Sequence, residues 1–108
     1  MSFSYAAEKF ASARSALMLP HPQGEAQSIA SAFSECHIGL DRLDRSLLDD
    51  DARKWLNELE LLMSTSGLED PHREGLHLLK ARMLSVDDQF QLSSVIDELQ
   101  CWFRINRD

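Results

Sequence analysis

The sequence predicts an all-α fold, arranged as an antiparallel bundle of four to five helices. Apolar residues recur every three or four positions along most of the chain, which is the period of an amphipathic helix. Leucine is abundant, whereas valine and isoleucine, which favour strands, are scarce. The connections between the periodic segments are short, so neighbouring helices are expected to pack antiparallel.

The chain length predicts one domain. With 108 residues and 44% hydrophobic content, the chain can bury a single core, and we expect residues 1–108 to form one helical domain. The N-terminal residues lack a basic segment followed by an apolar run, and no stretch approaches the ~20 apolar residues of a membrane span. We therefore expect a cytoplasmic protein whose two cysteines, Cys36 and Cys101, are reduced and buried, a disulfide being the minority alternative.

The first helix is expected to run from about Ser4, which can cap it, to Leu19. Pro20 and Pro22 should end it, because proline restricts the preceding residue and cannot continue the hydrogen-bond ladder. The residues of its apolar face are Phe3, Ala6, Phe10, Ala13 and Leu17.

The second helix is expected to begin between Pro22 and Glu25 and to continue to about Arg45. Gly39 inside this helix costs about 1 kcal/mol relative to alanine, so it indicates a close helix crossing or a bend. The apolar stripe of the helix comprises Ile29, Phe33, Cys36, Leu40, Leu43 and Leu47.

The third helix is expected to start in the run 49–51, where one aspartate serves as the N-cap, and to reach about Thr65. Ser66 and Gly67 should stop it in the manner of a glycine C-cap. Its apolar face comprises Ala52, Trp55, Leu56, Leu59, Leu62 and Met63.

A short fourth helix should follow, with Asp70 as its N-cap, Pro71 as its first residue and Leu84 at its close. The fifth helix has the clearest start, because Ser85 and Asp88 form a variant of the capping box. The expected core residues are Leu56, Leu59, Leu92, Val95, Ile96, Leu99 and Phe103, and the aromatic residues that fit core positions are Phe33, Trp55, Phe90, Trp102 and Phe103.

The sequence contains no complete catalytic or metal-binding pattern. There is no zinc-type CxxC or HExxH motif, no P-loop and no GxGxxG. His37 and Asp41 could share a ligand, but two ligands do not make a site. Glu74 and His77 have the spacing of half a di-iron site, and the second half is missing. We therefore expect no catalytic residue, no bound metal, no cofactor and no enzymatic activity.

The net charge of −7 is unevenly distributed, because residues 1–34 carry Glu8 and Glu25 against Lys9 and Arg14. All of the excess negative charge lies after residue 34. An acidic domain repels nucleic-acid phosphates and anionic lipids, so we expect neither as a direct partner. It attracts basic proteins and speeds their encounter, although acidity also serves solubility alone.

The negative charge is densest between positions 41 and 51, and the candidate partner-binding residues there are Asp41, Asp44, Asp49, Asp50 and Asp51. Glu58 extends this surface, and a partly buried Trp55 would be an aromatic anchor beside it. Glu69, Asp70 and Glu74 form a second candidate patch. Two interpretations remain open: a binding surface, or N-caps and a solvated helix face whose acids pair with Arg42, Arg45, Arg53 and Lys54.

Four segments of the chain resemble a known family: FSECHIGL (33–40), LLDDDARKW (47–55), GLED (67–70) and LSSVIDEL (92–99). Over residues 33–103 the chain is similar to the immunity proteins of bacterial contact-dependent growth inhibition systems. The resemblance implies neutralisation of a cognate toxin, often a nuclease acting on tRNA or DNA, by tight binding. It carries over no catalytic residue.

Two other function classes stay open. One is a helical adaptor or assembly protein that forms a homodimer through an apolar face. The other is a small enzyme whose site the sequence does not reveal. A large exposed apolar face would favour the adaptor, and a deep pocket with convergent polar groups would favour the enzyme.

Overall fold

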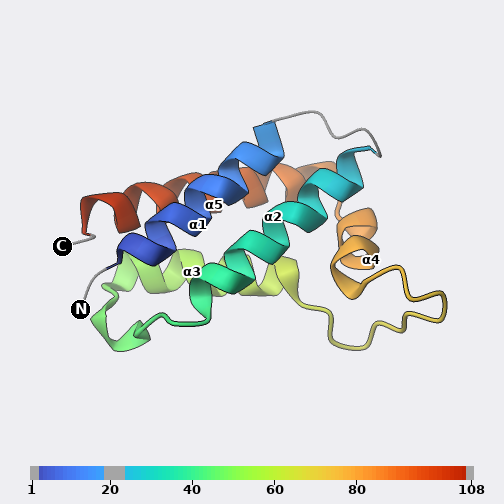
Figure 1. The fold of residues 1–108 in the computed structure, drawn as a ribbon, viewed down its shortest axis with the longest axis horizontal. Helices are drawn as coiled ribbons and strands as arrows, with labels where there is room; N and C mark the ends of the chain where they lie inside the picture. Colours follow the sequence, from blue (N-terminus) through green and yellow to red (C-terminus); the bar gives the residue numbers. More distant parts are fainter. Residues whose placement is uncertain (1–2, 19–23, 107–108) are drawn as a thin grey trace.

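The computed structural model describes residues 3–18 and 24–106, and these residues form five α-helices and one short 3-10 helix without any strand. The all-α prediction is therefore confirmed (Figure 1). The elements in chain order are α1 (Ser4–Met18), α2 (Glu25–Leu40), η1 (Arg45–Leu47), α3 (Asp50–Met63), α4 (Leu76–Met83) and α5 (Val86–Ile105).

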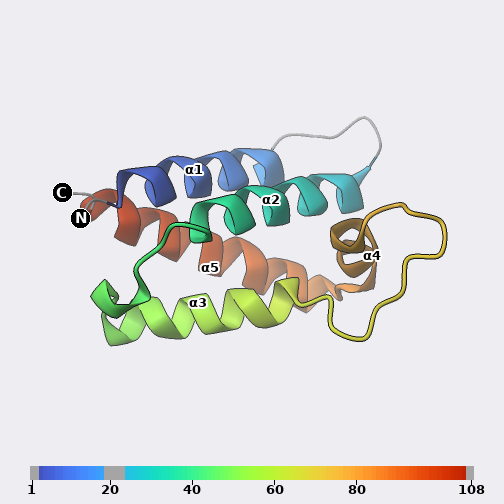
Figure 2. The ribbon, with the colours of Figure 1, turned by 60° about the horizontal axis from the view of Figure 1, so that its bottom comes forward.

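The four long helices lie along the long axis of the molecule, and successive long helices run in opposite directions (Figure 2). Helix α1 packs against both α2 and α5, and α5 in turn packs against α3. The short helix α4 packs mainly against α2. The connection between α2 and α3 lies at one end of the molecule, and α4 with the start of α5 lies at the other end.

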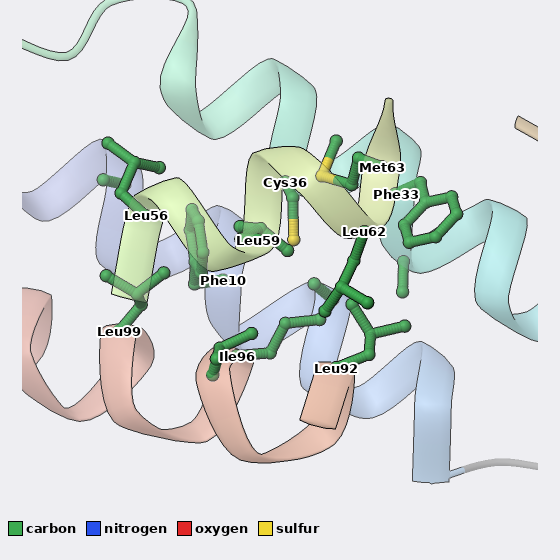
Figure 3. Close-up of a cluster of buried hydrophobic side chains, with 14 of the residues drawn as sticks. Phe10, Phe33, Cys36, Leu56, Leu59, Leu62, Met63, Leu92, Ile96 and Leu99 are labelled. Atoms are coloured by element: carbon green, nitrogen blue, oxygen red, sulfur yellow. The ribbon is translucent and has the colours of Figure 1, made fainter. Parts of the chain in front are cut away.

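One hydrophobic cluster fills the space between the helices. Figure 3 shows Leu59 of α3 and Ile96 of α5 near each other with Phe10 beside them, while Phe33 lies beside Leu62 and Met63. The seven core residues expected on the third and fifth helices are buried, namely Leu56, Leu59, Leu92, Val95, Ile96, Leu99 and Phe103. Their burial confirms that the helical periodicity of α3 and α5 marks the inward faces.

Aromatic rings join the first helix to the last. The ring of Phe103 lies 5.1 Å from that of Phe10 and 5.7 Å from that of Phe3, measured between centroids. The indole of Trp102 meets Phe3 edge-on at 5.0 Å. Such edge-to-face and tilted pairs add stability beyond the area that they bury.

Helix α2 ends at Leu40, so the predicted end at Arg45 is wrong. The carboxylate of Asp44 accepts hydrogen bonds from the backbone N–H and hydroxyl of Ser46, at 3.1 and 2.6 Å, and thereby caps η1. This local bond competes with continuation of the helix. As a result Leu47, which was placed on the apolar stripe of the second helix, lies in η1 and is exposed.

Gly39 marks a close helix crossing, one of the two predicted alternatives. A Cβ atom built at Gly39 would lie 2.9 Å from the Cβ of Lys9, an atom fixed to the backbone of α1. Real Cβ atoms do not approach so closely, so a side chain here would push α1 away from α2.

The C-terminal end of α3 also differs from prediction. Asp49 caps α3 as expected, but the helix ends at Met63 rather than Thr65, because Ser64 is extended. Gly67 has a φ of +79°, and it belongs to the following turn instead of capping the helix.

Helix α4 begins at Leu76, five residues after the predicted start at Pro71. The carboxylate of Asp70 accepts hydrogen bonds from the N–H groups of Glu74 and Gly75, at 2.8 and 2.7 Å, so it organises a loop instead of capping a helix. Arg73 has a φ of +53°, which interrupts any helical path before Leu76.

The start of α5 agrees with the sequence prediction, whereas Cys101 and Phe90 are less buried than expected. The capping box of Ser85 and Asp88 is present. Both cysteines are free, but only Cys36 is buried, since Cys101 is half-buried. Phe90 was placed in the core and is instead 71% exposed, because it lies two residues, or about 200°, from the buried Leu92. Pro20 and Pro22, the predicted end of the first helix, lie outside the described residues.

Within residues 3–18 and 24–106, no helix is long and apolar enough to span a lipid bilayer.

Candidate functional site

Two of the predicted acidic residues serve the structure. Asp49 accepts hydrogen bonds from the backbone N–H of Ala52 at 2.9 Å and from the indole Nε1 of Trp102 at 3.0 Å. These two bonds lower the pKa of Asp49. The bonds from Ser46 likewise lower the pKa of Asp44. Both carboxylates therefore hold helix starts, which is the capping interpretation left open by the sequence.

Three other predicted acids remain available on α3. Asp50 and Asp51 are exposed in its first turn, and Glu58 is half-buried two turns later. None of the three forms an ion pair or side-chain hydrogen bond with another residue of the described chain. We call Asp50, Asp51 and Glu58, together with Trp55, the α3 acidic face.

The spacing along α3 places most of this face on one side of the helix. Asp51, Trp55 and Glu58 stand at i, i+4 and i+7, so they are neighbours on the helix surface. Trp55 is half-buried and packs against the hydrophobic core. The face thus combines an anchored aromatic ring with uncompensated negative charge, as the sequence suggested for a partly buried Trp55.

Asp41 lies apart from the α3 acidic face. It borders a hollow of about 450 Å³ between α2, α3 and α4, and Glu60 borders the same hollow. Glu60 and Glu58 are two residues apart on α3 and therefore point about 200° apart. The structure thus divides the predicted patch into three acids on α3, the separate Asp41, and the two structural caps Asp44 and Asp49.

Three of the four basic residues between these acids contact other groups, so the expected pairing of all four along one solvated face is not observed, and Lys54 forms no ion pair within the described chain. Arg45 forms a bidentate ion pair with Glu60, at 2.7 and 3.0 Å. Arg53 donates to the backbone carbonyl of Ser46 at 3.3 Å. The guanidinium of Arg42 lies 5.4 Å from the ring centroid of Tyr5. The acids of the α3 acidic face consequently keep their charge uncompensated by these arginines.

The three acids of the second predicted patch, Glu69, Asp70 and Glu74, also have different roles in the structure. Asp70 holds the loop before α4, and Glu74 pairs with Arg82 at 3.2 Å. Glu69 is exposed and has no ion-pair partner among the residues that the structure describes. The second patch therefore offers one uncompensated charge instead of three.

A histidine pair at the contact of α2 and α4 was not predicted. The rings of His37 and His77 lie 6.1 Å apart, and His77 Nδ1 lies 3.3 Å from the hydroxyl of Ser34. Burial, and then the charge of His37, lower the pKa of His77. No sequence pattern could join two histidines that are 40 positions apart. Over the described ranges, no group of three or more His, Cys, Asp or Glu side chains is arranged to hold a metal ion.

Comparison of the chain with protein-family models, with curated proteins and with solved structures gave no significant match. The resemblance to immunity proteins, the absence of catalysis and the choice of partner therefore remain predictions from the sequence.

Proposed function

We propose that this chain is an immunity protein that binds a cognate basic toxin, a nuclease being the expected class, and neutralises it by covering its active-site surface. The observation that supports the proposal is the α3 acidic face, where Asp51 and Glu58, without ion-pair partners in the described chain, flank the half-buried Trp55. Both the family resemblance and the negative charge of this face favour binding of a basic toxin.

The physical basis of the proposal is charge complementarity. A nuclease must bind phosphates and therefore presents basic side chains around its active site. Carboxylates on a complementary surface steer the encounter and select the partner, while an aromatic residue at the centre contributes most of the contact energy.

The α3 acidic face is also held rigidly. Ala52, Leu56 and Leu59, on the adjoining inward side of α3, are at most 2% exposed. A surface fixed in this way loses little conformational freedom when it binds, which favours affinity.

The proposal is tested by expressing the chain together with the product of the gene beside its own and measuring growth and binding. The test variant carries Asp50→Asn, Asp51→Asn and Glu58→Gln, and it leaves Asp44 and Asp49 in place because they hold helix starts. We expect binding to weaken by roughly tenfold, mainly through a slower association rate at low salt, with loss of protection from the toxin.

The matched control removes the same number of charges from other surfaces, by Glu8→Gln, Glu25→Gln and Asp87→Asn. All three residues are exposed and lack ion-pair partners within the described part of the chain. The control should protect cells as the wild type does. Equal protection and equal affinity in both variants would contradict the assignment of the α3 acidic face, and a neighbouring product that is neither toxic nor bound would contradict the proposed function itself.

A second candidate function, an adaptor that dimerises through an apolar face, is favoured by another surface. Met83, Val86 and Phe90 are 62%, 65% and 71% exposed, and the last two stand at i and i+4 on α5. They belong to the end of the molecule opposite to the connection between α2 and α3. Large apolar side chains grouped in this way are typical of protein–protein interfaces.

If the chain is an adaptor of this kind, we expect the wild-type chain to form a dimer. The substitution Phe90→Ser should convert this dimer to a monomer. The side chain of Phe90 is mostly solvated in the single chain, so the substitution should leave the helical fold of the monomer intact, as circular dichroism measures. The measurement is molar mass by light scattering across a wide concentration range. A wild-type chain that stays monomeric throughout would exclude this candidate and leave the immunity function in place.

A further inference from the structure

Helix α4 is the shortest of the five α-helices of the described chain and has the fewest buried residues among them. It has eight residues, of which only Ala81 is fully buried, and no side chain caps its first turn. The loop before it contains two residues with positive φ, Arg73 at 53° and Gly75 at 105°. Helices this short are not stable alone, so α4 depends on its contact with α2.

His77 is at the centre of that contact. Its ring meets the edge of Phe33 at 5.8 Å between centroids, and its Nδ1 lies 3.3 Å from the Ser34 hydroxyl. Phe33 is fully buried. Because the ring of His37 lies only 6.1 Å away, charging both imidazoles would bring two like charges together across the contact.

The other charged groups around the pair do not balance two such charges. On one side, Glu60 of α3 is neutralised by Arg45 of η1, which leaves Asp41 of α2 as the unpaired carboxylate bordering the hollow. On the other side, Glu74 before α4 is neutralised by Arg82.

Helix α4 itself adds one unpaired positive charge, since Lys80 lies in its last turn and forms no ion pair within the described residues, whereas Arg82 is paired with Glu74. One unpaired carboxylate, that of Asp41, would therefore face two imidazolium charges.

We propose that the contact of α4 with α2 is a pH-sensitive latch, in which protonation of both His37 and His77 releases α4 and uncovers Phe33. The inference is independent of the proposed toxin binding. Release is a local opening, because α4 contributes only Ala81 to the buried core, with Leu78 partly buried against it.

The direction of the effect follows from linkage. Burial, with a smaller contribution from His37, lowers the pKa of His77 in the folded chain below the ordinary value of 6.5. The docked helix therefore favours the neutral ring. The contribution of the neutral His77 ring to the docking of α4 is complete above pH 6.5. It is lost as the pH falls below that value and through the lower pKa that His77 has in the folded chain.

The test is hydrogen exchange with mass-spectrometric detection at about pH 8 and about pH 5, the range in which histidine titrates. Rates are corrected for intrinsic exchange. We expect the protection of residues 76–83 to fall at the lower pH, while the protection of residues 92–103 stays constant. In the variant His37→Gln/His77→Gln the protection of residues 76–83 should no longer depend on pH.

The matched control is His72→Gln, because His72 is an exposed histidine in the loop before α4. This variant should behave as the wild type does. His37→Gln alone, at an exposed position of α2, keeps the contacts of His77 and should reduce the pH dependence. The proposal is overturned if residues 76–83 are unprotected at both pH values, if their protection is the same at both, or if the double variant keeps the wild-type pH dependence.

Discussion

Replacing Phe103 with alanine is expected to lower the free energy of unfolding by about 3–5 kcal/mol. The ring of Phe103 is fully buried and contacts the rings of Phe3, Phe10 and Trp102. Its removal opens a cavity where α1 meets α5, and the fixed helices around it close that cavity only in part. Urea unfolding followed by circular dichroism measures the change.

Phe90→Ala is the matched control, since it removes the same side chain from the same helix. Phe90 is 71% exposed, so its truncation should change the free energy of unfolding by less than about 0.5 kcal/mol. Similar losses in the two variants would show that α5 does not present Phe103 to the core.

The two cysteines are expected to differ in reactivity by orders of magnitude. Cys36 is fully buried, and burial, with a smaller effect of Glu35, raises the pKa of its thiol to about 12. At pH 8 the Cys36 thiol therefore stays in its unreactive, protonated form. Cys101 is half-buried and accessible.

A thiol reagent should therefore label one cysteine of the folded chain and two after unfolding in denaturant. The variant Cys101→Ser should show no labelling when folded, which identifies Cys101 as the reactive residue. Labelling of Cys36 in the folded variant at the rate of an exposed thiol would contradict the burial of Cys36 between the helices.

The helices that could be predicted from the sequence are those in which several local signals agree. In α5, the Ser85 capping box and an unbroken apolar repeat specify the same start and the same inward face. At the end of α2 the signals conflict, because Leu43 and Leu47 continue the apolar stripe, whereas α2 ends at Leu40 and Asp44 bonds to Ser46 to start η1. The sequence alone therefore does not indicate whether the helix continues beyond Leu40 or ends there.

The candidate site could be predicted only in part, for a related reason. The sequence indicates where acidic residues are dense, but not which of them have partners. Asp49 binds the indole of Trp102, 53 positions away, and His37 meets His77 only because α4 folds back on α2. Contacts of this kind arise from tertiary packing, and a pattern of neighbouring residues does not contain them.

The pairing of the first helix with the last has a consequence for synthesis on the ribosome. Phe3 and Phe10 find their aromatic partners on α5, so nearly the whole described chain must be made before these rings are covered. Folding that depends on contacts between distant positions is slower than folding through local ones. During translation the hairpin of α1 and α2 would emerge with an open apolar side, and a nascent chain in that state is a natural substrate for chaperones.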